Sequence, residues 1–110
     1  MAVYSAFAAA VEDYRHGQAS RWYRKREDPD GEAFMTARDE AHRLRTVTRQ
    51  ALYRVKLLTD DRAVILAAER AYQCTWEVSN AQDQADRDAR DARARLAIEG
   101  FVSHAAPLLR

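Results

Sequence analysis

The sequence has few of the residues that interrupt helices or crosslink chains. Its 110 residues include three glycines, two prolines and one cysteine. So few turn-forming residues argue against a β-rich fold, which needs many turns. The lone Cys74 cannot form an internal disulfide, so the cysteine content gives no sign of an oxidising compartment. We therefore expect an all-α, cytoplasmic protein.

Excess charge of one sign and long apolar runs are also lacking. Eighteen Lys and Arg residues stand against 17 Asp and Glu, and 47% of the chain is hydrophobic. This composition is too apolar for a disordered chain, and 32% charged residues are too many for a membrane span. The apolar run 2–11 lacks a preceding basic segment, so we interpret it as a first helix rather than a signal peptide. We expect one soluble domain over residues 1–110, with no membrane contact.

The basic residues are unevenly divided between the two types. Sixteen of the 18 are arginine, and alanine is abundant. Such a composition is typical of a GC-rich bacterium or its phage, and it indicates an origin rather than a function.

Two stripes of apolar residues at steps of three and four predict the first two helices. The first, with Gln18 in its gap, predicts a helix over about residues 2–26 and consists of Val3, Phe7, Val11, Tyr14 and Trp22. Between the stripes, Asp28 suits an N-cap and Pro29 suits a first helical position. The second stripe predicts the most regular helix of the chain and consists of Phe34, Ala37, Ala41, Leu44, Thr48, Ala51, Val55 and Leu58.

A third stripe follows the capping sequence Thr59-Asp60-Asp61 and permits two organisations. It consists of Val64, Ala68, Ala71, Thr75, Val78, Gln82, Ala85, Ala89, Ala92 and Leu96. If it is continuous, the chain is an antiparallel bundle of three helices with a long C-terminal helix. Ser79-Asn80, followed by Gln82 and Asp83, also resembles an N-cap sequence. The alternative is therefore a bundle of four helices with a break near Ser79-Asn80.

The helix lengths implied by the continuous organisation do not match. At about 1.5 Å per residue the first two helices span roughly 38 and 43 Å, and an unbroken third spans roughly 66 Å. Its apolar residues beyond about Asp88 would project past the bundle into water, which is unfavourable. A second copy would cover them, so we expect a homodimer. The expected interface consists of Ala85, Ala89, Ala92, Leu96, Phe101 and Val102.

Basic residues gather on the first two predicted helices. No acid lies between Arg15 and Arg26, while Trp22 and Tyr23 are interleaved with the cations. Basic residues mixed with aromatics can bind phosphates and stack on bases, although a net charge of +1 is small for a nucleic-acid-binding domain. The alternative function is thus a nucleic-acid-binding accessory protein. Its candidate residues are Arg15, Arg21, Arg24, Lys25, Arg26, Arg43, Arg45 and Arg49.

Nothing in the sequence forms a recognisable catalytic or metal-binding motif. Cys74 has no identifiable histidine partner, and there is no glycine-rich phosphate loop. His16 and His42 each follow an aspartate by three residues, but on the predicted helices they do not converge. We expect no catalytic residue, metal, cofactor or small-molecule substrate. The leading hypothesis is a non-enzymatic protein-protein interaction or adaptor module that binds another protein and self-associates.

Overall fold

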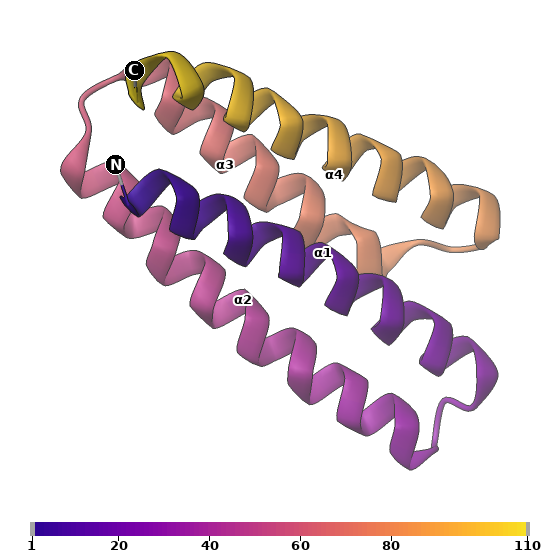
Figure 1. Cartoon of the computed structure of the whole chain (residues 1–110). Helices are drawn as coiled ribbons and strands as arrows, with labels where there is room; N and C mark the ends of the chain where they lie inside the picture. The colour runs from indigo at the N-terminus through magenta and orange to yellow at the C-terminus, as the bar shows by residue number, and fades with distance from the viewer. Residues whose placement is uncertain (1, 110) are drawn as a thin grey trace.

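The computed structural model describes residues 2–109, which form four consecutive antiparallel helices and no strand (Figure 1). These are α1 (Ala2–Glu27), α2 (Glu32–Leu58), α3 (Arg62–Glu77) and α4 (Gln84–Ala105). Short 3-10 turns, η1 (Val78–Asn80) and η2 (Ala106–Leu109), follow α3 and α4. The predicted all-α antiparallel bundle is confirmed, and its C-terminal helix is 22 residues long.

The four helices share one hydrophobic core. The predicted α1 stripe supplies Phe7 and Val11, and α2 and α3 supply Val55 and Val64, all at most 1% exposed. From α4, the Phe101 ring packs edge-on against the Phe7 ring, with centroids 4.9 Å apart. Because every helix contributes large apolar groups to this cluster, burial of apolar area holds all four together.

Side-chain caps start two of the helices. Asp61 accepts a hydrogen bond from the Val64 amide at 3.1 Å, as the capping sequence before α3 predicts. The expectation that Asp28 caps α2 was wrong, because α2 begins at Glu32 after Gly31. Asp28 instead accepts from the Asp30 amide and closes the turn that precedes the helix.

Between α3 and α4 the chain breaks at Ser79-Asn80, which is the four-helix alternative. Asp83 is extended, with φ −151° and ψ 178°, and its side chain caps α4. The indole Nε1 of Trp22 donates to the Ala81 carbonyl at 2.8 Å. The buried Gln18 amide donates to two backbone carbonyls at the end of α3, at 3.2 and 3.0 Å. Hydrogen bonds from α1 thus hold the connection that turns α4 back.

The break changes which face of α4 is buried. The expected continuation of the stripe through Gln82, Ala85, Ala89 and Leu96 was wrong, because these four residues are exposed and Ala92 is half-buried. Residues 78–83 do not follow the 100° rotation of an α-helix, so the phase starts afresh at Asp83. The buried residues of α4 are Ala94, Ala97, Ile98, Phe101 and Ala105.

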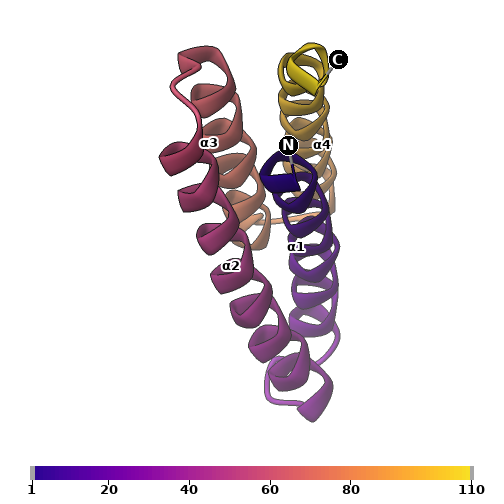
Figure 2. The same ribbon diagram turned by 60° about the vertical axis from the view of Figure 1, so that its left-hand side comes forward.

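The helices differ in length, and the core is displaced towards the end of the bundle that holds both termini. The α1 and α2 helices have 26 and 27 residues, whereas α3 has 16. The hairpin of α1 and α2 therefore extends beyond α3 and α4 (Figure 2). No residue between 23 and 40 is buried.

Candidate protein-binding groove

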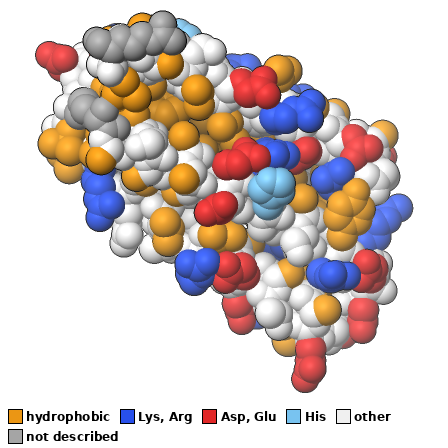
Figure 3. Space-filling view, viewed as in Figure 1, with side chains coloured by type: hydrophobic (Ala, Val, Ile, Leu, Met, Phe, Trp, Pro, Cys, Tyr) orange, Lys and Arg blue, Asp and Glu red, His pale blue; other side chains and the backbone are white. Residues whose placement is uncertain are grey.

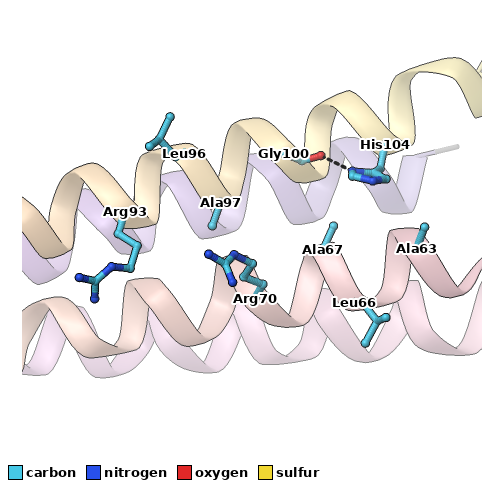
Figure 4. Close-up of a pocket in the computed structure, with 9 residues that line it drawn as sticks. All are labelled: Ala63, Leu66, Ala67, Arg70, Arg93, Leu96, Ala97, Gly100 and His104. Atoms are coloured by element: carbon cyan, nitrogen blue, oxygen red, sulfur yellow. Dashed lines mark hydrogen bonds between the residues drawn. The ribbon is translucent and has the colours of Figure 1, made fainter.

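An open groove of about 530 Å³ runs along the surface between α3 and α4. Figure 4 shows the residues of the two helices that border it. The α3 helix contributes Ala63, Leu66, Ala67 and Arg70, and the α4 helix contributes Arg93, Leu96, Ala97, Gly100 and His104. We refer to these nine residues as the α3/α4 groove.

The facing surfaces of the groove are made of small residues. Ala63 and Ala67 point from α3 towards α4, and Ala97 points back from α4 (Figure 4). A Cβ atom built on Gly100 would meet no heavy atom within 4 Å. Small residues at these positions leave room for another backbone to approach the two helices closely.

Two leucines flank the groove in the solvent. Leu66 is 51% exposed and Leu96 is 64% exposed, and they point to opposite sides of the opening (Figure 4). Covering them would be favourable by about 25 cal/mol for each Å² of apolar surface removed from water. The flanks therefore favour an apolar partner.

Arginines dominate the charge of the groove. Arg70 extends from α3 and Arg93 from α4 into the space between the two helices (Figure 4). Neither forms an ion pair with another residue in 2–109, and no acidic residue in that range lines the groove. His104 lies at the far end, where its Nδ1 is 2.8 Å from the Gly100 carbonyl oxygen. The groove is thus apolar along its length and cationic at one end.

The residues predicted as a dimer interface are separated by the fold. Leu96 lines the groove, whereas Ala85 and Ala89 are exposed and Ala92 is half-buried on α4 away from it. Val102 is 46% exposed and lies near Tyr4 of α1. Phe101 is 1% exposed and belongs to the core of its own chain. The chain folds back and covers Phe101 itself, so the projecting apolar end that motivated a homodimer is absent from residues 2–109.

Several of the predicted phosphate-binding arginines already form ion pairs with carboxylates of the same chain. Arg15 donates to both Asp91 oxygens at 2.9 and 3.1 Å and also pairs with Glu12, and its side chain is 12% exposed. Its pKa is raised, chiefly by the hydrogen bond to Glu12. Elsewhere Arg24 pairs with Glu27 and Arg43 with Glu40.

The remaining predicted cations lie apart. Arg21, Arg45 and Arg49 lie near one another around Tyr14 and Tyr72. The pKa of Arg21 is lowered, chiefly by burial and to a smaller extent by the positive charges of Arg38 and Arg45. Lys25 and Arg26 lie at the end of α1, where the Arg26 guanidinium is 5.1 Å from the Trp22 ring centroid. Figure 3 shows Lys and Arg side chains mixed with Asp and Glu over the face that includes α1. The eight residues therefore do not form one basic face.

Other kinds of site find no support in the described part of the chain. Within residues 2–109, no group of three or more His, Cys, Asp or Glu side chains is placed to hold a metal ion. Cys74 is buried and free. None of the four helices is long and apolar enough to cross a membrane.

The sequence interpretation missed eight of the nine groove residues. Ala63, Leu66, Ala67 and Arg70 follow one another at helical spacing on α3, beside the buried Val64. This second row of mostly small and apolar residues can be seen in the sequence, but it indicates a groove only if α4 lies beside α3. With a continuous third helix, no such neighbour exists.

Comparison with known proteins gives one family. The family described as KilB plasmid transfer protein matches residues 1–109. No curated protein and no solved structure matches the chain.

Proposed function

The chain belongs to the KilB plasmid transfer protein family, and we propose that it serves plasmid transfer as a non-enzymatic accessory protein that binds another protein. The observation that carries this proposal is the α3/α4 groove, whose leucines remain in solvent after the chain has completed its own core. Exposed apolar surface of this kind marks binding sites for other proteins. The lone, free cysteine suits action in the cytoplasm.

The two other interaction modes have less support. Binding of nucleic acid through α1 and α2 would use a set of cations in which Arg15, Arg24 and Arg43 already pair with carboxylates. Self-association was expected because a continuous third helix would project from the bundle, but α4 turns back along the bundle and leaves no such projection among residues 2–109. We therefore favour a different protein as the partner.

The test combines plasmid transfer with protein stability. Leu66→Ser with Leu96→Ser removes the apolar flanks of the groove, and both side chains are at least half exposed. We expect transfer frequency to fall markedly, while the free energy of unfolding changes by no more than about 0.5 kcal/mol per site.

The matched control is Leu57→Ser. Leu57 lies near the end of α2, does not line the groove and is 81% exposed. This variant should transfer plasmid as the wild type does. Normal transfer by a folded Leu66→Ser, Leu96→Ser protein would overturn the proposal.

A further inference from the structure

We propose that the occupant of the α3/α4 groove is an amphipathic helix of another protein, with acidic residues at the end that meets Arg70 and Arg93. This inference rests on the proposed function and specifies its partner. The argument has three steps, concerning shape, charge and symmetry.

The shape of the groove suits a helix. From Arg93 to His104 the groove follows α4 for about 16 Å, which corresponds to three turns of an apposed helix. A helix laid against Ala67, Ala97 and Gly100 can approach closely, because these residues have little or no side chain. Its apolar residues, spaced at three and four, would lie between Leu66 and Leu96.

The charge of the groove selects an acidic partner. Arg70 and Arg93 point into the same space, and neither has a carboxylate partner among residues 2–109. Two other arginines of α4 differ in this respect, because Arg87 pairs with Asp88 and Arg90 pairs with Asp86. Carboxylates on the incoming helix would meet both guanidinium groups, whereas lysines would be repelled.

Symmetry disfavours a second copy of this chain with the two grooves facing each other. A two-fold contact through the groove would place two copies of Arg70 and two of Arg93 in one interface, and no acidic residue of 2–109 lines the groove to neutralise them. Four like charges in one interface are unfavourable. An acidic helix from another protein neutralises the pair instead.

The test uses two synthetic peptides of 16 residues that differ only in charge. Both carry leucines at helical spacing, and the flanking residues are glutamate in one and lysine in the other. Fluorescence anisotropy of the labelled peptides measures binding to the full chain. We expect the glutamate peptide to bind and the lysine peptide to fail. Arg70→Glu with Arg93→Glu should raise the Kd of the glutamate peptide by about tenfold or more and should allow the lysine peptide to bind.

The matched control carries the same change of charge elsewhere. Arg54→Glu with Arg95→Glu alters two exposed residues that do not line the groove, so the Kd of the glutamate peptide should change by less than about threefold. Circular dichroism of each variant verifies that it is folded.

Several results would overturn the inference. They are failure of the glutamate peptide to bind, equal binding of both peptides, and a two-chain mass in light scattering that Arg70→Glu with Arg93→Glu abolishes. Binding of a single-stranded oligonucleotide that depends on Arg70 and Arg93, in place of the peptide, would assign the groove to nucleic acid. If the leucine variant loses plasmid transfer while the charge variant keeps it, the proposed function stands and the acidic partner is wrong.

Discussion

Replacing Gly100 by alanine should stabilise the fold and weaken binding at the same site. Gly100 lies inside α4, where glycine costs about 1 kcal/mol relative to alanine. The new methyl group would have no heavy atom within 4 Å, so no steric penalty offsets the gain. We expect the free energy of unfolding to rise by about 1 kcal/mol and Tm to rise by about 5 °C.

The other glycine inside a helix provides the comparison. A Cβ on Gly17 would lie 2.6 Å from Cδ1 of Leu44 on α2, so this leucine would have to move. The gain in helix propensity is then offset by an overpacking cost of about 1–3 kcal/mol. Gly17→Ala should give no gain, or a loss of up to about 2 kcal/mol.

Urea unfolding followed by circular dichroism at 222 nm measures both variants, and anisotropy of the glutamate peptide measures the groove. The Gly100 methyl projects into the space an incoming helix would use, so Gly100→Ala should raise the Kd while it raises stability. Equal stabilisation by the two alanines would refute the close contact with Leu44. A destabilising Gly100→Ala would refute the open space at the groove.

Four further tests concern the interior. Asp91→Asn removes a charged partner of the mostly buried Arg15 and should lower the free energy of unfolding by about 1–3 kcal/mol in urea. The hydrogen bond from Arg15 lowers the pKa of Glu12 from 4.5 in the folded protein. The stability that this bond confers is therefore present above pH 4.5 and is lost as the pH falls through the pKa of Glu12 in the folded protein, and Arg15→Gln should reduce this acid dependence. Trp22→Phe removes the indole donor to the α3/α4 connection and should cost about 1–3 kcal/mol, measured in urea, whereas no loss would mean that this bond is dispensable. Cys74 is 8% exposed and should react with a thiol reagent only slowly until the chain unfolds.

The sequence predicts the apolar stripe of α2 and its end at Leu58, because this information lies within the helix itself, but it places the start at Pro29 instead of Glu32. The stripe from Phe34 to Leu58 has no gap, and Asp61 caps the next helix as its position suggests. The break after α3 is different. Local spacing continues through the alanines, and the turn is held by Trp22 and Gln18, which lie about 60 residues earlier in the chain.

The α3/α4 groove exists only because the chain turns after α3, and residues distant in the sequence hold that turn. Leu96 could be recognised as an exposed apolar residue of an interface from the alanine-rich stripe alone. Leu66 and Arg70 can be recognised as part of the same site only when α4 folds back beside α3. Tertiary hydrogen bonds decide which residues share a surface, so local spacing cannot assemble the site.

Because the α1/α2 hairpin extends beyond the core, the molecule has a firm end of high local stability around the core and a loose end of low local stability at the hairpin tip. Residues 23–40 bury no side chain, so their opening costs little of the free energy that global unfolding costs. Backbone amides there should exchange with deuterium and yield to proteases long before those around Phe7 and Phe101. The α3/α4 groove lies along the firm part. Movement at the hairpin tip can therefore occur while the binding surface keeps its shape, and a bound helix should slow exchange in α3 and α4 without changing it at the tip.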